Sequence, residues 1–262
     1  MQTDSQTLAA LRSAIIGLIR EAGEAVMDVY ATNFTVETKA DDSLVTLADQ
    51  HAEALIIEGL RGIEPSIPVI SEESFNGMQI LSPGNRFWLV DPLDGTKEFV
   101  DRNGEFTVNI ALIEDQRPIL GVVFAPAQER LFSGAEGIGA FVDDARGCRA
   151  IRTRAVPNEG LTVVCSRSHG HDASLECFLA TRRVAMRANV GSSLKLCLVA
   201  SGEADLYPRF GRTMEWDIAA GDAVLRAAGG LVRCLQGSVL IYGKPGFDNP
   251  HLVASGSTLF DA

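Results

Sequence analysis

The sequence predicts a mixed α+β and α/β fold, with helices packed on an antiparallel sheet in the first half and alternating strands and helices in the second. Two strand-like runs, 106–113 and 119–124, are separated by a short polar segment, which is typical of an antiparallel hairpin. After about residue 160, strand-like and helix-like segments alternate, which is typical of α/β structure. With 262 residues, of which 46% are hydrophobic, the chain can form one large domain or two modest ones.

Two helices are predicted near the start of the chain. Between Leu8 and Tyr30, apolar residues recur every three or four positions, and they are Leu8, Leu11, Ile15, Leu18, Ala22, Val26 and Val29. This spacing predicts a long amphipathic helix. A second helix is expected from Thr46 to about Leu60, because Thr46 and Asp49 resemble a capping box. On the residues alone, Asp49 is a capping residue.

A buried strand is predicted for residues 87–90, and it stops at an acidic turn. The turn has the sequence Asp91-Pro92-Leu93-Asp94-Gly95-Thr96. Pro92 favours an extended conformation at Asp91 and Gly95 permits a tight turn, so the two carboxylates can face one small volume. Converging carboxylates repel unless a cation lies between them, and Mg²⁺ prefers oxygen ligands of this kind. The alternative is an ordinary loop, because Asp-Pro and Asp-Gly are common turn dipeptides.

The remaining strands of the first half are predicted to form a meander. A short strand, 67–71, precedes Glu72 and Glu73, and the runs 131–133 and 139–142 can extend the hairpin. Charged residues, glycine and proline become frequent between 143 and 159, which indicates a boundary. We therefore predict an N-terminal α+β subdomain, 1–150, that carries most of the acidic candidates. A C-terminal α/β subdomain, 151–262, would supply the others.

The second half is predicted to alternate strands and helices. Expected strands cover residues 161–165, 184–186, 204–207, 231–234 and 252–254. Expected helices cover about 173–182, 191–202 and 216–228. This order predicts an α/β arrangement.

Four acids lie where a strand ends or a helix begins, and they are Glu72, Asp91, Asp94 and Asp217. Side chains at such places can point into a cleft, so the four are candidates for one metal site. Two of them have a simpler interpretation. Glu72 beside Glu73 can be a solvated edge, and Asp217 can be the N-cap of the helix that follows it.

The sequence also predicts a second site, which would bind an anion. Gly191-Ser192-Ser193 is predicted to open a helix, and Lys195 lies in its first turn, where the helix dipole disfavours a cation. A bound anion would offset that cost, and Arg209, just past a predicted strand, can add a second contact. The alternative for Lys195 is a surface lysine. Gly95 and Thr96 also resemble a helix start whose backbone N–H groups could hold phosphate oxygens.

Composition excludes several classes of protein. The net charge of −11 argues against non-specific binding to nucleic acid, so any nucleotide ligand should be small. Five scattered cysteines do not predict a disulfide framework. Neither a signal peptide nor a membrane-spanning run is recognisable, so we expect a cytoplasmic protein.

Three motifs together resemble those of the lithium-sensitive, magnesium-dependent inositol monophosphatase superfamily. They are the segments Pro68–Glu73, Trp88–Thr96 and Trp216–Gly221. The segments Val90–Phe99, Asn103–Ile113, Gly191–Lys195 and Leu206–Gly211 are closer to its 3′(2′),5′-bisphosphate nucleotidase branch. The resemblance runs in order along nearly the whole chain.

The resemblance implies a five-layer αβαβα sandwich of the inositol monophosphatase and fructose-1,6-bisphosphatase type. It implies two or three Mg²⁺ ions, with Li⁺ as an inhibitor. Their ligands would be Glu72, Asp91, the carbonyl of Leu93, Asp94 and Asp217. It also implies that Asp49 bonds Thr96, that this catalytic pair activates the attacking water, and that Glu72 and Thr96 hold that water.

The nucleotidase branch implies hydrolysis of adenosine 3′,5′-bisphosphate to AMP and phosphate, with the sulfated relative PAPS as a second substrate, in the recycling of a by-product of sulfate assimilation. Expected substrate contacts are Leu93, Asp94, Gly95, Thr96, Gly191, Ser192, Ser193, Lys195, Arg209 and Asp217. Two residues depart from the pattern: Leu44 replaces a usual proline, and Glu215 adds an acid that could alter metal affinity.

Alternatives remain open at this point. The protein could act on inositol phosphate or on another sugar or polyol phosphate, or it could be a metal- and nucleotide-binding sensor without turnover. We expect a monomer or a homodimer. Peripheral attachment to a bacterial inner membrane, which the resemblance also suggests, has no recognisable anchor in the sequence.

Overall fold

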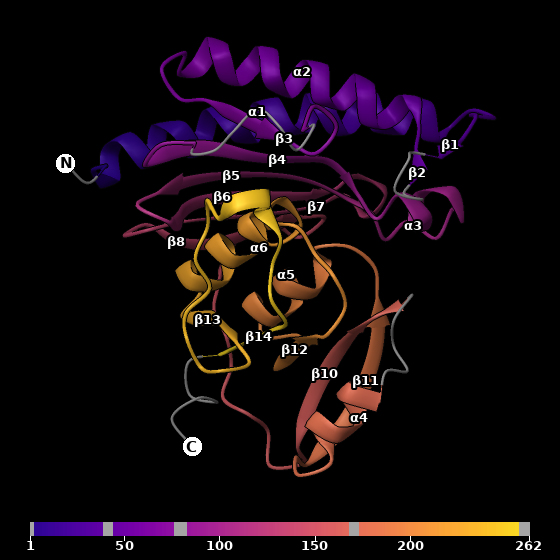
Figure 1. Cartoon of the computed structure of the whole chain (residues 1–262), viewed down its shortest axis with the longest axis vertical. Coiled ribbons are helices and arrows are strands. Elements are labelled where there is room, and N and C mark those ends of the chain that lie inside the picture. Colours follow the sequence, from indigo (N-terminus) through magenta and orange to yellow (C-terminus); the bar gives the residue numbers. More distant parts are fainter. Residues whose placement is uncertain (1–2, 39–43, 76–82, 168–172, 257–262) are drawn as a thin grey trace.

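The chain folds into five layers in a computed structural model that describes residues 3–38, 44–75, 83–167 and 173–256. Figure 1 shows long helices above a large sheet, further helices between that sheet and a smaller one below, and a short helix on the far side. The helices of these layers are α1 (Ser5–Tyr30), α2 (Leu47–Ile63), α5 (Leu194–Ala200), α6 (Glu215–Ala227) and α4 (Ala173–Leu179). The expected αβαβα sandwich is therefore confirmed.

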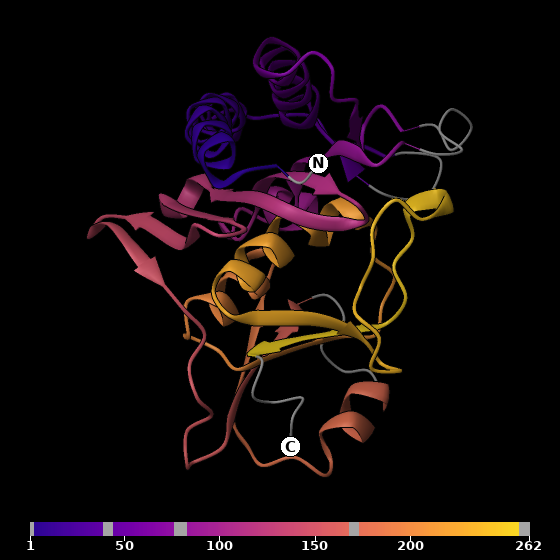
Figure 2. The ribbon, with the colours of Figure 1, turned by 90° about the vertical axis from the view of Figure 1, so that its left-hand side faces the viewer.

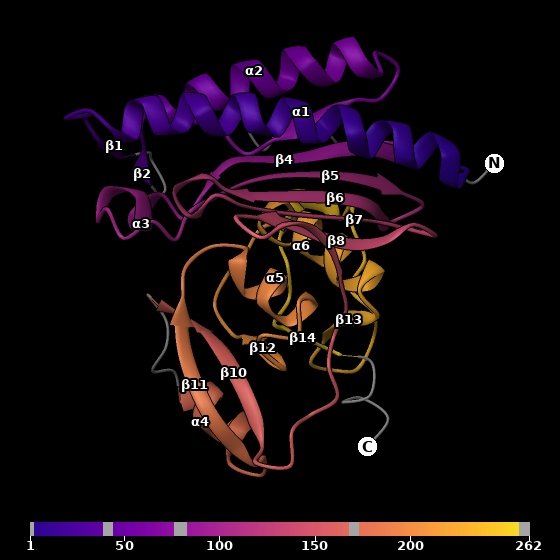
Figure 3. The ribbon, with the colours of Figure 1, turned by 180° about the vertical axis from the view of Figure 1, so that it is seen from behind.

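The first layer follows the predicted capping and periodicity. Asp4 caps α1 by accepting the N–H groups of Gln6 and Thr7, so the helix begins three residues earlier than predicted. All seven residues of the predicted apolar stripe are buried. Thr46 and Asp49 form the expected capping box of α2. Figure 3 shows α1 lying along the outer face of the large sheet.

The large sheet has seven strands in the order β3-β4-β5-β6-β7-β8-β9. The first pair is parallel and the others are antiparallel. The strands are β3 (Val69–Ser71), β4 (Arg86–Asp94), β5 (Thr107–Glu114), β6 (Arg117–Ala125), β7 (Arg130–Ala135), β8 (Gly139–Asp144) and β9 (Gly147–Ile151). The predicted meander is present, and it is longer than expected.

Two details of this sheet differ from the prediction. The β5–β6 turn has only two residues, Asp115 and Gln116, whose positive φ angles of 48° and 63° suit a tight hairpin. The polar segment after residue 143 includes β9, which pairs with β8 at the edge of the sheet. Its polar composition reflects an exposed edge strand, so that segment is not simply a linker. The division of the chain at residue 150 stays a prediction.

The smaller sheet has five strands in the order β11-β10-β12-β14-β13. They are β10 (Leu161–Ser166), β11 (Val184–Val190), β12 (Leu206–Arg209), β13 (Gly230–Cys234) and β14 (Leu252–Gly256). In Figure 2, α6 lies between this sheet and the larger one. Gly121 and Gly134 permit the close approach, since a Cβ atom at Gly121 would lie 2.3 Å from the carbonyl oxygen of Ala220. The second half of α6 thereby packs closely against β6 and β7.

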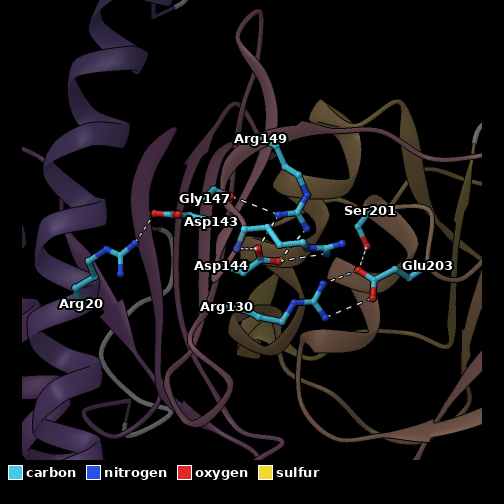
Figure 4. A network of polar contacts seen from close by, with 9 residues as sticks. Arg20, Arg130, Asp143, Asp144, Gly147, Arg149, Ser201 and Glu203 are labelled. Atoms are coloured by element: carbon cyan, nitrogen blue, oxygen red, sulfur yellow. Dashed lines mark hydrogen bonds and ion pairs between the residues drawn. The ribbon is translucent and has the colours of Figure 1, made fainter.

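Ion pairs also join the layers (Figure 4). Arg20 of α1 pairs with Asp143 of β8 at 2.7 Å, and Arg130 of β7 pairs with Glu203, just after α5, at 2.5 Å. Arg149 bonds both oxygens of Asp144 within the β8–β9 hairpin. Partly exposed pairs of this kind each contribute about 1 kcal/mol or less to stability. The apolar cores supply most of the stability of the layered structure, and these ion pairs contribute little to it.

Cysteine pairing and membrane-spanning helices can both be checked in the described part of the chain. All five cysteines are free thiols. The helices of the described ranges include none with the length and apolar character needed to cross a membrane.

Candidate metal centre and active site

An irregularity in β4 brings Asp91 and Asp94 to one side of the sheet. The strand was predicted to stop before Asp91. It instead pairs with β5 as far as Asp94. Asp91 lies opposite Asn109 and Asp94 opposite Thr107, so β4 contains one extra residue between them. In a regular strand, residues three apart face opposite sides, and the extra residue restores a common side. The sequence spacing therefore places two carboxylates together only because of this bulge.

Three acids from separate elements form a cluster. Glu72 follows β3, Asp91 lies in β4 and Asp217 lies in the first turn of α6, and they offer ligand oxygens that all lie within 4.8 Å of one another. The interpretation of Asp217 as the N-cap is wrong, because Met214 is the N-cap of α6. Asp217 is the third helical residue, and its Oδ2 atom accepts the N–H of Met214 at 2.9 Å. One carboxylate oxygen thus serves the helix start, which leaves the other for a ligand.

The cluster is electrostatically strained without a cation. Burial raises the pKa of Asp91 well above its usual range, and the charges of Glu72, Asp94 and Asp217 add to the effect. Burial and then Asp94 raise the pKa of Asp217 to about 7. The donor set consists of hard carboxylate oxygens, which matches the chemistry that Mg²⁺ prefers. These residues fit a divalent cation.

Asp94 lies beside this cluster and is tied to the second half of the chain. Its Oδ2 atom accepts the Ser193 N–H at 2.6 Å, the Ser193 hydroxyl at 2.8 Å and the Asn109 amide at 3.4 Å. Asp91 likewise uses Oδ1 to accept the Leu93 N–H at 3.1 Å. Within the described ranges, the second oxygen of Asp91, of Asp94 and of Asp217 has no hydrogen-bond partner. Each carboxylate is therefore anchored by one oxygen and presents the other.

The Asp49–Thr96 bond that the resemblance implied is not present in the described chain. The Thr96 hydroxyl donates to the carbonyl of Leu93 at 3.3 Å, whereas Asp49 accepts the N–H and hydroxyl of Thr46 at 2.7 and 2.8 Å. Burial raises the pKa of Asp49 to about 6, although the Thr46 bonds oppose the shift. Gly95 has a φ of 90° and starts the short helix α3 (Thr96–Val100). The capping role of Asp49 is thus the one that its contacts confirm.

Lys195 is buried, with 5% of its surface exposed, so the surface-lysine interpretation is wrong. Its ammonium donates to the carbonyls of Val190 and Ser192 at 3.1 and 2.5 Å, which places it under the turn of residues 191–193. Burial lowers its pKa to about 8, the charge of Asp94 opposes that shift, and Arg209 adds to it. Arg209, the last residue of β12, donates to the carbonyl of Arg212. The two cations are close enough to affect each other and Asp217.

Sequence reasoning missed Asn109 and Thr107, which lie directly opposite Asp91 and Asp94 on β5. Both side chains are almost fully buried. Two polar residues at alternate positions of an otherwise apolar strand share one face, and that pattern could have identified them.

Glu215 does not add an acid to the metal site. Its buried carboxylate accepts the N–H groups of Gly243 and Lys244 at 2.6 and 2.9 Å, together with the Lys244 ammonium at 2.6 Å. Glu215 and Asp217 have different surroundings because residues two positions apart on a helix point in different directions.

The model of the inositol monophosphatase family matches residues 7–258 of the chain. The chain belongs to the inositol monophosphatase family. Members of this family are metal-dependent enzymes, and the cluster of Glu72, Asp91 and Asp217 is a group of side chains that can hold a metal ion.

Individual members of the family are similar to the chain over most of its length. The 3′(2′),5′-bisphosphate nucleotidase CysQ of Escherichia coli O157:H7 is 50% identical over 236 residues, which cover 89% of this chain and 94% of that relative. The crystal structure of CysQ from Bacteroides thetaiotaomicron has a TM-score of 0.81 and 35% identity, covering 94% of this chain and 97% of its own. An IMPase from Thermotoga maritima has a TM-score of 0.77 and 27% identity, covering 94% and 92%.

Proposed function

We propose that the protein is a Mg²⁺-dependent 3′(2′),5′-bisphosphate nucleotidase that hydrolyses adenosine 3′,5′-bisphosphate to AMP and phosphate. The observation that carries the proposal is a buried cation beside the acidic cluster: Lys195 lies under residues 191–193, and Ser193 in that turn bonds Asp94. A substrate with two phosphates needs a metal site for one and a cationic site for the other. The 50% identity to a relative named as this nucleotidase supports the same substrate.

Glu72, Asp91 and Asp217 would hold Mg²⁺, with Asp94 and the carbonyl of Leu93 completing a site for two or three ions. When bound, Mg²⁺ supplies a water of lowered pKa and neutralises charge on the phosphate that is cleaved. Li⁺ is expected to inhibit by competing at this site.

The chain's own residues position the reactants. Glu72 and Thr96 hold the attacking water, which requires the Thr96 hydroxyl to turn from the Leu93 carbonyl, and Asp49 supports the start of α2 beside them. The backbone of Gly95 and Thr96 approaches the reacting phosphate. Gly191, Ser192, Lys195 and Arg209 contact the second phosphate, since Lys195 and Arg209 are two cations that the fold brings to this region.

Phosphate release from a panel of esters tests the proposal. We expect Mg²⁺-dependent release from adenosine 3′,5′-bisphosphate that is faster than release from inositol 1-phosphate, and inhibition by Li⁺. Faster turnover of inositol 1-phosphate would favour the polyol phosphatase, which the structural similarity to an IMPase keeps as second candidate. Absence of turnover with every ester would favour a sensor.

The wider biological setting rests on the same proposal. Hydrolysis of PAPS is a second reaction of the same site, and both reactions belong to by-product recycling in sulfate assimilation. The cytoplasmic location, the association with an inner membrane and the choice between monomer and homodimer stay predictions.

A further inference from the structure

Asn109 and Ser193 occupy a buried position directly behind the acidic ligands. Only 1% of Asn109 and 3% of Ser193 is exposed. Asn109 lies on β5 opposite Asp91, and Ser193 is the residue that precedes α5. Asn109 belongs to the first half of the chain and Ser193 to the second. They meet through a hydrogen bond from the Asn109 amide to the Ser193 hydroxyl, at 3.0 Å.

These two side chains join Asp94 to Asp217. The Ser193 hydroxyl lies 2.6 Å from the backbone carbonyl of Asp217 and 2.8 Å from Oδ2 of Asp94. The Asn109 amide reaches the same Asp94 oxygen at 3.4 Å. Asp94 and Asp217 are distant in sequence, and no hydrogen bond in the described chain joins them directly. Ser193 therefore bridges the two residues.

The hydrogen count restricts how this contact works. A hydroxyl has one proton, so Ser193 can donate to the Asp217 carbonyl or to Asp94, but not to both at once. The Asn109 amide donates to the hydroxyl oxygen and so leaves its proton for one of these acceptors. Asp94 keeps the 2.6 Å bond from the Ser193 N–H in either case. Oδ2 of Asp94 is thus always held, and Oδ1 is left to a ligand.

We infer that Ser193 and Asn109 are positioning residues for the metal ligands, and that Ser193 is not the substrate contact that the sequence predicted. Through Ser193, the turn that covers Lys195 and the acidic cluster form one hydrogen-bonded unit. The inference rests on the proposed function only in taking Mg²⁺ as the cation. Residues that orient metal ligands commonly change metal affinity by about 10- to 100-fold when they are replaced.

Calorimetric titration with Mg²⁺, without substrate, tests this role. Ser193→Ala and Asn109→Ala should each weaken Mg²⁺ binding by about 10-fold or more. Ser255→Ala is a matched control, because Ser255 is also fully buried and its hydroxyl donates to the backbone carbonyl of Gly256, within the small sheet. Its Mg²⁺ affinity should stay within about twofold of the unaltered protein. Losses below twofold in both site variants would overturn the inference.

The double variant gives an independent measure. Because Asn109 acts through the Ser193 hydroxyl, the double variant should bind Mg²⁺ within about twofold of the weaker single variant. Losses that multiply would show two unrelated effects and would overturn the coupling.

Folding defects are separated by melting each variant in EDTA. Ser193→Cys exchanges one atom of the side chain and replaces a strong donor by a weak one, so it should show the same loss of affinity with a melting temperature close to that of the unaltered protein. A folded Ser193→Cys protein with unaltered Mg²⁺ affinity would refute the role. Since no substrate is present, a protein that passes these tests and fails to hydrolyse nucleotides would refute the proposed function alone.

Discussion

Lys195 gives the most direct test at the scale of a residue. Its ammonium has a pKa of about 8, so it is charged below that pH and becomes neutral above it. We expect KM for adenosine 3′,5′-bisphosphate to rise as pH increases through about 8, because the second phosphate loses a cationic partner. KM for a phosphate monoester without a second phosphate should change little over the same range, and parallel changes in both would contradict the assignment.

Removal of this side chain should separate the two classes of substrate. Lys195→Ala should lower kcat/KM for the bisphosphate by about 100-fold, which is about 2.7 kcal/mol, in line with a lost charge-assisted contact. The loss for a simple monoester should be less than tenfold. Steady-state kinetics on both substrates measure the difference, and equal losses would remove the second-phosphate role.

Asp91 should show opposite effects on stability and activity. Burial and three neighbouring acids disfavour its charge, so Asp91→Asn relieves repulsion in the metal-free protein. We expect the melting temperature in EDTA to rise by about 2–4 °C, which corresponds to about 1 kcal/mol for a chain of this size. Phosphatase activity should fall at least 100-fold. A lower melting temperature in EDTA would show that the acids do not repel one another.

At the scale of an element, the start of α6 depends on a buried ion pair with the segment that precedes β14. The Glu215 side chain has no exposed surface, and the ammonium of Lys244 is one of its partners. Lys244→Met should cost about 2 kcal/mol or more, because it leaves a buried carboxylate with only backbone donors. Arg212→Ala, which removes an exposed pair with Asp248, should cost less than about 1 kcal/mol. Urea unfolding in EDTA compares the two, and equal losses would contradict the buried role.

The elements themselves could largely be predicted from local sequence. The apolar period of α1, the Thr46–Asp49 capping box and the alternation of strands and helices after residue 160 are local signals, and the structure agrees with them. The edge strand β9 was missed because its exposed residues lack apolar alternation. The position of Asp217 as third residue of α6 was missed because Met214 offers no side-chain cap that a sequence pattern would reveal.

The contacts between distant segments could not be predicted in this way. The four acids were found individually from their places at element ends, and the resemblance brought them into one site. The bonds of Ser193 to Asp94 and to Asp217 depend on how the two sheets are placed around α5 and α6, which no local pattern encodes. Glu215 shows the same limit, since its partners lie 28 and 29 residues further along the chain.

At the scale of the whole molecule, metal binding should hold the layers together. The clustered ligands come from the end of β3, from β4 and from the start of α6, so an ion bound by all three links the large sheet to the central helices. Mg²⁺ at 100 times its dissociation constant should stabilise the folded protein by about 2.7 kcal/mol. Melting curves across a Mg²⁺ titration measure this, and Glu72→Gln should reduce the gain. An equal gain in that variant would place the ion elsewhere.

The bulge of β4 has a consequence for how such a site can arise. A bulge changes the phase of a strand by one residue, so side chains three positions apart across it share a face. Here that change aligns Asp94 with Asp91, and it also leaves Pro92 and Leu93 without partners in the ladder, which frees a backbone carbonyl between the two acids. Deleting one of these two residues would restore the regular ladder, with Asp94 still opposite Thr107 and on the same face as Asp91, but it would remove the unpaired backbone that frees this carbonyl. A single extra residue therefore separates a regular strand with two acids on one face from one that also offers a backbone oxygen between them.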